Sequence, residues 1–588
     1  YDLYLDVIDS VIRKVYKTET STSSDYNYIT YDASGNPVYN KITILPENIG
    51  ISDNITWSNN SAGSTGSITV NLPNSKTQTV YYAINDDCEL IENNSSKVST
   101  SAAGTSSAYK VKGSSNANVI NNPSGTEITT GSDKITNKVY SNNTITGTLS
   151  KDYNIIGGSA IANQGVIGDV IADFVNNVTT TGGNSYRHTA GALLNYKGTI
   201  GSITGDFIGN YATMGGAIYN SDSSATIGNI TGDFIGNYSS IGGAIYNDGR
   251  IGNITGDFIG NYSSMGGAIY IWPGAISSIT GDFIGNYASG SSYAYGGAIY
   301  IWTGTISSIV GDFIGNYAKT SATSSSYYAR GGAIYNTSAN GIGLVNNRFI
   351  NNYAQSSNAD VKAQGGAIYT NQSLTITADN GTSEFTGNWV SQDGGTTKNY
   401  EAIYVDSAST TLTLKAVNNG KIILNDYING AEGYKTTITG DSTGIINLFN
   451  DIKNADVITS KVTLDMHDPS NTSHTYNLRS LSATDTNASI DINFQNNTAD
   501  KIVTDNNSTG TLTINNFVIS GTTPQTFADG YKLQILQNNN SSSGSNSSSN
   551  SSELTFTVNG VTFKMIKVDG GTFTMGCTSE QGSDCYDI

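Results

Sequence analysis

The sequence has little charge, little cysteine and no long apolar segment. Only 13% of its 588 residues are charged, and 47 acidic against 29 basic residues give a net charge of −18. Such an acidic balance, without any basic cluster, argues against binding to nucleic acid or to an anionic membrane surface. No run of 18 apolar residues occurs, so we expect no membrane-spanning helix in this fragment.

The residues of common catalytic and metal sites are also sparse. Cys88, Cys577 and Cys585 are too few to hold a chain of this size with disulfides, so composition alone favours a secreted protein. The histidines, His188, His467 and His474, lack the spacing of a metal site, and no phosphate loop, cofactor motif or Ser-His-Asp set is present. We therefore expect no enzyme activity and no cofactor or metal. The chain opens at Tyr1 without Met or a signal peptide, and we interpret it as an excerpt from a longer precursor.

What the sequence does have is repetition. One phrase, GDFIGNY followed by GGAIY, is written five times from Gly205 to Tyr335, and a diverged copy runs from Asn347 to Tyr369. Its phenylalanines recur every 24–36 residues, a period typical of solenoids, propellers and arrays. They are Phe207, Phe234, Phe258, Phe283, Phe313 and Phe349.

The shortest copy indicates which of these architectures applies. Residues 254–277 contain short β-type runs broken by Gly, Ser and Asn, with no helical period. About 24 residues suffice for one turn of a β-coil, whereas a propeller blade needs about 40, and the leucine framework of a leucine-rich repeat is missing. The sequence therefore predicts an all-β fold, a parallel β-helix in which equivalent residues of successive turns stack.

Stacking predicts columns of identical side chains. The six phenylalanines should fill a narrow core, and one asparagine per turn should bond the next at a bend. These asparagines are Asn210, Asn237, Asn261, Asn286, Asn316 and Asn352. Insertions between NY and GGAIY (289–295, 319–330 and 354–364) should share one face of the solenoid. We predict a contact surface on this face; the alternative is that the insertions are solvated loops that bind no ligand. The predicted contact residues are Tyr293, Tyr295, Tyr327, Tyr328, Trp272 and Trp302.

An acidic column precedes the phenylalanines. Because each acidic residue adjoins an inward phenylalanine, we expect it to point outward, with like charges about 5 Å apart in successive turns. Solvent screening, Lys or Arg side chains from neighbouring bends, or bound cations would offset the repulsion, and Arg348 is placed to end the column. The column is interpreted as a solvated face, with a cation site and a saccharide-contacting groove as alternatives. The members are Asp173, Asp206, Asp233, Asp257, Asp282 and Asp312.

Composition divides the chain into five parts. We predict β-rich early turns or a cap at 1–154, regular repeats at 155–405 and irregular turns at 406–537. Residues 538–552, rich in Ser and Asn, form a predicted flexible linker, and 553–588 start a new β segment that stops abruptly. Residues 1–20 suit a helix or strands equally.

The alternation of GGAI with FxxN resembles the passenger domains of autotransporter-type bacterial surface proteins, above all the polymorphic outer-membrane proteins. GGAI begins at Gly215, Gly242, Gly266, Gly296, Gly331 and Gly365. The resemblance implies a right-handed β-helix, export to the bacterial cell surface, and adhesion. The phrase VDGGTFTMG from Val568 resembles the opening of the formylglycine-generating-enzyme (sulfatase-modifying factor) family, whose catalytic cysteines lie further along that domain and are not matched here.

These observations favour a non-catalytic extracellular adhesin or structural rod. Its expected partner is a glycan or protein receptor on a host cell or other surface, with self-association left open. One alternative is a stalk that displays a C-terminal lectin-like head; another is a polysaccharide-degrading β-helix.

Overall fold

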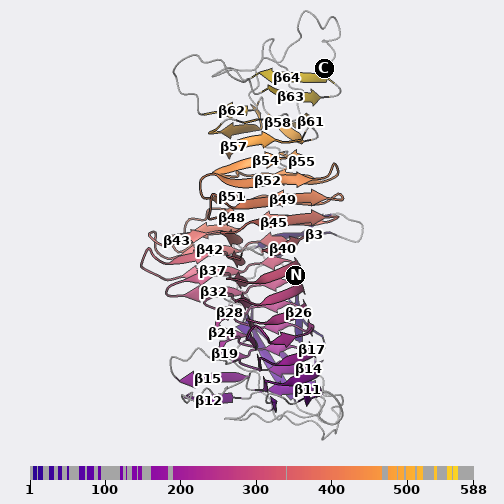
Figure 1. The fold of residues 1–588 in the computed structure, drawn as a ribbon, viewed down its shortest axis with the longest axis vertical. Helices are drawn as coiled ribbons and strands as arrows, with labels where there is room; N and C mark the ends of the chain where they lie inside the picture. Colours follow the sequence, from indigo (N-terminus) through magenta and orange to yellow (C-terminus); the bar gives the residue numbers. More distant parts are fainter. Residues whose placement is uncertain are drawn as a thin grey trace, which may run out of the picture. The chain divides into compact units, whose positions relative to one another are not determined.

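The computed structural model confirms the predicted all-β fold, a parallel β-helix of stacked strands (Figure 1). It describes the strands before residue 160, then residues 160–175, 177–182, 190–338, 341–466, 474–485, 488–495, 498–506, 508–509, 513–520, 536–539, 553–558 and 561–566. Only the backbone is described in the strands before 160, at 513–520 and after 539. No helix occurs in these residues, so none of them forms a helix that could cross a membrane.

The chain divides into two compact units. Unit 1 contains residues 1–372 and 385–404, and unit 2 contains residues 373–384 and 405–588. The repeated phrase falls within unit 1.

One turn of unit 1 follows the phrase in order. In the turn that starts at Arg250, β26 (Arg250–Thr255) and β27 (Phe258–Ile259) lie in one sheet, β28 (Tyr262–Ser263) in a second and β29 (Ile269–Ile271) in a third. Each strand pairs in parallel with its counterpart in the next turn, as when Phe258 aligns with Phe283 and Ile269 with Ile299. A residue of the phrase therefore keeps its place on the same sheet in every turn.

We name the three sheets of unit 1 by their content. The long-strand sheet contains β14 (Val166–Val175), β17 (Thr199–Thr204), β22 (Ile230–Thr231), β26, β30 (Ala275–Thr280), β35 (Thr305–Val310) and β40 (Ile342–Val345), with the short strands β18 (Phe207–Ile208), β23 (Phe234–Ile235), β27, β31 (Phe283–Ile284), β36 (Phe313–Ile314) and β41 (Arg348–Ile350). The tyrosine sheet contains β15 (Val178–Gly182), β19 (Tyr211–Met214), β24 (Tyr238–Ile241), β28, β32 (Tyr287–Gly290), β37 (Tyr317–Thr320), β42 (Tyr353–Ser356) and β47 (Trp389–Ser391). The GGAI sheet contains β13 (Ile161–Asn163), β16 (Leu193–Tyr196), β20 (Ile218–Ser221), β25 (Ile245–Asn247), β29, β34 (Ile299–Ile301), β39 (Ile334–Asn336) and β44 (Ile368–Thr370).

The two glycines of GGAI are required by geometry. Gly266 has a φ of +66°, a left-handed conformation that favours glycine. A Cβ atom on Gly267 would lie 1.9 Å from the carbonyl oxygen of Gly297 in the next turn. The first glycine therefore makes the turn, and the second lets successive turns approach closely enough to pair.

The N-terminal strands combine hairpins with the start of the stack. The strands β1 (Tyr4–Ile8) and β2 (Val11–Tyr16) pair antiparallel, so the described residues of 1–20 are β rather than helical. Parallel pairing with the repeats already involves β9 (Ile120–Asn122) and β12 (Thr144–Thr148), upstream of residue 155.

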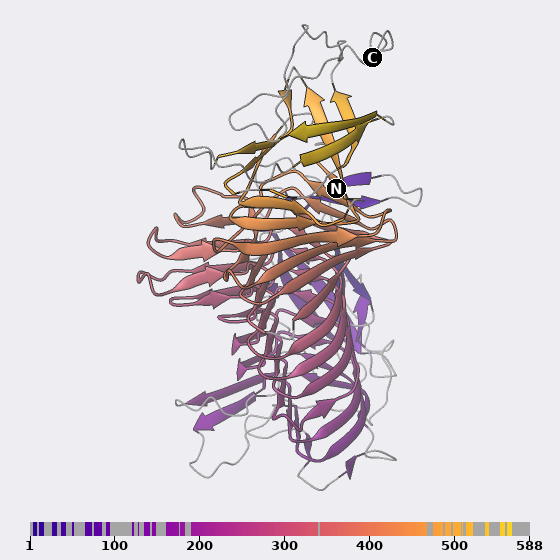
Figure 2. The same cartoon turned by 45° about the horizontal axis from the view of Figure 1, so that its top comes forward.

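Unit 2 has its own parallel stack (Figure 2). One row pairs β45 (Leu374–Asp379), β49 (Thr411–Val417), β52 (Tyr434–Gly440), β54 (Ala455–Thr459) and β57 (Ser480–Ala483) in order. A second row pairs β50 (Lys421–Leu424), β53 (Ile445–Leu448), β55 (Thr463–Asp465), β58 (Ser489–Gln495) and β61 (Thr513–Ser520). A separate antiparallel hairpin joins β63 (Glu553–Val558) and β64 (Val561–Ile566).

Several sequence-based expectations lie outside the described residues. They concern His188, His467, Cys88, Cys577, Cys585 and residues 540–552 of the predicted linker.

Candidate contact surface

The phenylalanine column forms the centre of unit 1. Its rings are buried, and neighbours stack face to face with centroids 4.6–4.9 Å apart from Phe174 to Phe385. The six predicted members lie in this series, which adds one ring at each end. Such stacking fixes the vertical register of the turns, because an offset of one residue would remove every ring from the column.

The asparagine column lies at the bend between the long-strand and tyrosine sheets. Asn261 is typical: its Nδ2 donates to Asn286 Oδ1 (2.8 Å) and to the Phe234 carbonyl (2.8 Å), while its Oδ1 accepts from the backbone N–H and Nδ2 of Asn237 (3.0 Å each). Every predicted asparagine is fully buried. A buried amide with four partners is stabilising, whereas an unpartnered one would cost folding free energy.

The acidic column differs from its predicted outward orientation. Asp173, Asp206 and Asp233 are buried, and each accepts a hydrogen bond from the backbone N–H of the aspartate in the next turn. The same bonds continue through Asp257 and Asp282 at 2.8 Å. The outward expectation was wrong because these residues lie at a bend rather than in a regular strand, so their carboxylates point along the column axis.

Backbone N–H groups therefore supply part of the compensation for the like charges. Burial, with repulsion from Asp312, still raises the pKa of Asp282 to about 7. At the end of the column Asp312 forms an ion pair with the guanidinium of Arg348, whose Nε donates at 3.0 Å. The structure thus places Arg348 where the column needs a cation.

The long bends form an additional small sheet. It contains β33 (Ala294–Tyr295), β38 (Tyr328–Arg330) and β43 (Lys362–Gln364), which pair in parallel beyond the ends of β32, β37 and β42. Figure 1 shows this bend sheet on the side of unit 1 away from the long-strand sheet. The insertions therefore do share one face, as the sequence predicts.

The tyrosines of this face are less available than expected. Tyr295 is buried and stacks on Tyr335 at 4.6 Å, so it belongs to the interior of the bend region rather than to a contact surface. Tyr293 and Tyr327 are half-buried and meet edge to face at 4.9 Å. Tyr328 is half-buried too, with the Arg330 guanidinium 3.9 Å from its ring centroid.

The tryptophans behave differently from the tyrosines. Trp272 and Trp302 directly follow β29 and β34 of the GGAI sheet, and they are 47% and 45% exposed. Their rings stack with centroids 5.4 Å apart and planes at 19°. Of the six predicted contact residues, these two are the exposed ones.

A second asparagine column escaped the sequence reasoning. Asn163, Asn195, Asn220 and Asn247 stand in register at the end of the GGAI sheet, and each of the first three donates through Nδ2 to the Oδ1 of the next (2.7–2.9 Å). The signal was the residue that follows GGAIY or its counterpart, which is Asn in some turns and Ile in others. This second column is interrupted where the tryptophans occur.

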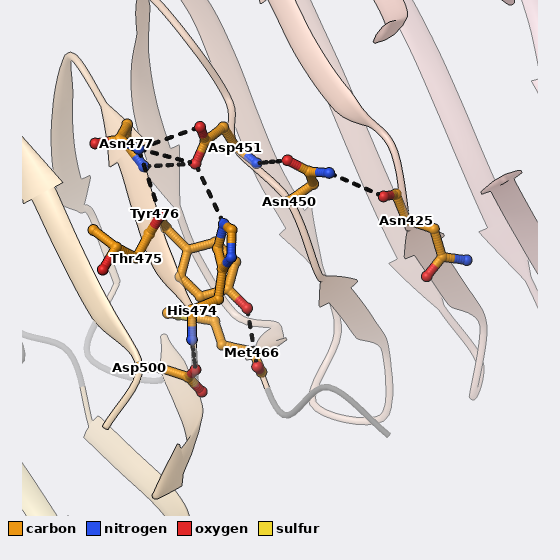
Figure 3. A network of polar contacts seen from close by, with 9 residues as sticks. All are labelled: Asn425, Asn450, Asp451, Met466, His474, Thr475, Tyr476, Asn477 and Asp500. Atoms are coloured by element: carbon orange, nitrogen blue, oxygen red, sulfur yellow. Dashed lines mark hydrogen bonds and ion pairs between the residues drawn. The ribbon is translucent and has the colours of Figure 1, made fainter. Parts of the chain in front are cut away.

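Unit 2 contains a polar network around Asp451 (Figure 3). Asp451 Oδ1 accepts from the Asn477 backbone N–H at 2.9 Å and lies 3.7 Å from His474 Nε2. The backbone N–H of His474 donates to Asp500 Oδ1 at 2.9 Å. Burial acts to raise the pKa of Asp451, but the nearby imidazole and the bonds from Asn477 hold it below its ordinary value. One of the scattered histidines is thus paired with a carboxylate, in an arrangement that ties turns together.

Neither the acidic column nor the polar network around Asp451 resembles a metal site. Within the part of the chain that the structure describes, no group of three or more His, Cys, Asp or Glu side chains is arranged to hold a metal ion. Comparison of the sequence with protein-family models and with curated proteins found no match.

Proposed function

We propose that this chain is a non-catalytic β-helical rod that works in attachment at a bacterial cell surface, through the side of unit 1 that carries the bend sheet. The observation that carries the proposal is the contrast between the two parts of each turn. The columns that hold the turns together repeat with little change, whereas the bends between the tyrosine and GGAI sheets differ in length and sequence. Variable loops on a constant scaffold are the usual arrangement of a recognition surface.

The acidic and aromatic columns support a structural rather than a catalytic role. Hydrolysis of a glycosidic bond requires two carboxylates in different environments, one with a raised pKa. The aspartate column does include a carboxyl group of raised pKa, Asp282, but its Oδ1 accepts the backbone N–H of the next turn as the Oδ1 atoms of Asp233 and Asp257 do, so we interpret the members as connectors. This argument favours an attachment protein over a polysaccharide-degrading enzyme.

The expected location and partners follow from composition and from the resemblance to autotransporter passenger domains. A polar, weakly charged β-solenoid suits an extracellular setting, and the net charge of −18 disfavours nucleic acid as a partner. We expect a glycan or protein receptor on a host cell or another surface.

An exchange of one bend tests the proposal. Replacing residues 319–330 by Ser-Met, the equivalent of Ser264–Met265 in a short turn, would shorten the bend while keeping GDFIGNY and GGAIY intact. We expect weaker attachment of the purified chain to epithelial cells, with the β-sheet circular dichroism retained and a lower melting temperature, because β38 pairs with both β33 and β43. A control with Thr255→Lys and Thr280→Lys, both exposed on the long-strand sheet, should attach normally. Undiminished attachment of the bend variant would contradict the proposal and favour a stalk that displays a C-terminal head.

A further inference from the structure

The repeat is broken in two consecutive turns at the end of the GGAI sheet. The register there runs Asn220, Asn247, Ile271, Ile301, Asn336, so two buried isoleucines replace the bonded asparagines. The residue that follows this position is Asp248 in the turn before and Thr337 in the turn after, but it is tryptophan in these two turns.

Stability alone does not explain the exposed tryptophans. In the next turn Thr337 occupies the position of the tryptophans, and its hydroxyl group donates to the carbonyl oxygens of Ile301 (3.1 Å) and Trp302 (2.9 Å). A small polar side chain therefore suffices at this position. Elsewhere in unit 1 the phenylalanine column and the column of Tyr270 and Tyr300 are buried. The column of Tyr211, Tyr238, Tyr262 and Tyr287 is partly exposed but recurs from turn to turn, whereas the tryptophans occur in two turns only. Two adjacent, half-exposed indoles leave apolar area in water, which is typical of an interaction site.

A carboxyl group borders this pair of rings. Asp248 is in register with Trp272, since Asn247 aligns with Ile271 and the Trp272 N–H donates to the Asn247 carbonyl (3.0 Å). Its side chain is half-buried, and Oδ2 accepts from the Tyr219 hydroxyl at 3.1 Å. Asp248 Oδ1 is closed to solvent, so a further donor would have to reach Oδ2, which has room for one because a carboxyl oxygen accepts about two hydrogen bonds.

We propose that Trp272, Trp302 and Asp248 form a subsite for a neutral saccharide. The proposal rests on the attachment function and specifies a ligand class for it. A pyranose ring presents an apolar C–H face that would lie against the indole next to Asp248, continuing the ring stack by one turn. Its hydroxyl groups would then lie beside the Asp248 carboxyl group and donate to it.

A saccharide fits these residues better than an organic cation does. A cation would be held by an ionised carboxylate beside the ring, but burial raises the pKa of Asp248 to about 7, so this group is only partly ionised near neutral pH. Two rings stacked along successive turns also extend the apolar surface in one direction, which suits a chain of sugar units. A basic peptide or a quaternary ammonium compound is therefore the competing outcome.

Tryptophan fluorescence gives a direct test. The chain has two further tryptophans, Trp389, which is 6% exposed, and Trp57, which lies outside the described residues, so the double variant Trp272→Ala/Trp302→Ala is used to subtract their share of the quenching by iodide. We would titrate the chain with hexasaccharides of glucose, N-acetylglucosamine and mannose, and with a mammalian glycoprotein before and after deglycosylation. Binding of a hexasaccharide would indicate a microbial or plant polysaccharide as the ligand. Binding of the glycoprotein that is lost on deglycosylation would indicate a host glycan. Choline and polylysine would be titrated in parallel.

We expect at least one saccharide source to protect the wild-type chain from iodide. The double variant should bind that source about tenfold or more weakly by affinity electrophoresis, and Asp248→Ala several-fold more weakly, with Asp248→Asn close to wild type. Tyr400→Ala removes an exposed aromatic ring elsewhere in unit 1 and should change nothing. Protection by choline or polylysine alone, or by no compound tested, would overturn the subsite.

Failure here is distinguishable from failure of the attachment proposal. Attachment to cells is tested by the bend exchange, which leaves Trp272, Trp302 and Asp248 in place. Loss of saccharide binding in the double variant with intact cell attachment would support the subsite and assign attachment to other residues.

Discussion

The asparagine column makes a quantitative prediction about Asn261. Substitution by alanine removes four hydrogen bonds and leaves the Asn237 N–H and the Phe234 carbonyl without their side-chain partner in a site closed to water. At about 1 kcal/mol for each net bond, and more for each stranded group, the loss should be about 3–5 kcal/mol. Since domains are stable by only about 5–15 kcal/mol, one such change should be plainly measurable.

Asn261→Asp tests the same reasoning from the other side. A carboxylate still accepts from Asn237 but would face the Phe234 carbonyl and the Asn286 amide oxygen, with no hydrogen to donate to either. We expect a loss greater than that of the alanine variant at pH 7 and a partial recovery at pH 4, where the protonated group can donate one bond.

The measurements are guanidinium unfolding and amide hydrogen exchange of the neighbouring turns, because a stacked repeat can open locally. The matched control is Asn253→Ala in the same turn. This asparagine is exposed and its side chain accepts one bond, from Ser278 at 2.8 Å, so we expect a change below about 0.5 kcal/mol. Equal costs for Asn261→Ala and Asn253→Ala would refute the assignment of the column as a main source of stability.

Three further predictions concern the other repeated positions. Gly267→Ala should lower the melting temperature far more than Gly209→Ala, since a methyl group on Gly267 would lie 1.9 Å from a carbonyl oxygen. Gly209 has open space around it, so its substitution costs only the strain of a side chain at a φ of +62°, about 1–2 kcal/mol. Because the pKa of Asp282 is raised from 3.8 to about 7 in the folded chain, its protonated form favours folding, and stability from this group should fall as pH rises from about 4 to about 7. Asp282→Asn should flatten that dependence, and an unchanged pH profile would contradict the raised pKa. Arg348→Ala leaves Asp312 at the end of the acidic column without its ion pair and should lower the free energy of unfolding by about 1–3 kcal/mol. The control is Lys415→Ala, which removes an exposed cation from a strand of unit 2 and should have no effect on thermal unfolding.

The sequence predicted the stack because periodicity is a property of the chain itself. Once Phe234 and Phe258 were known to recur in one phrase, only a coil with a turn of about 24 residues could place them in register. The bends did not follow from the same logic. Tyr295 and Asp233 are side chains at irregular positions, where the path of the backbone rather than alternation decides orientation, and both proved to be buried.

The second asparagine column occupies a position of the repeat that is not constant. In consecutive turns it is Asn247, Ile271, Ile301 and Asn336, so recurrence of one residue type does not predict it. In the structure the same position separates turns that are closed by amide bonds from turns that carry exposed indoles. In a stacked repeat, identical residues mainly hold the turns together, because each must satisfy the same neighbours above and below. Selective binding requires a place that differs from its neighbours, and the two isoleucine turns provide such a place beside Asp248.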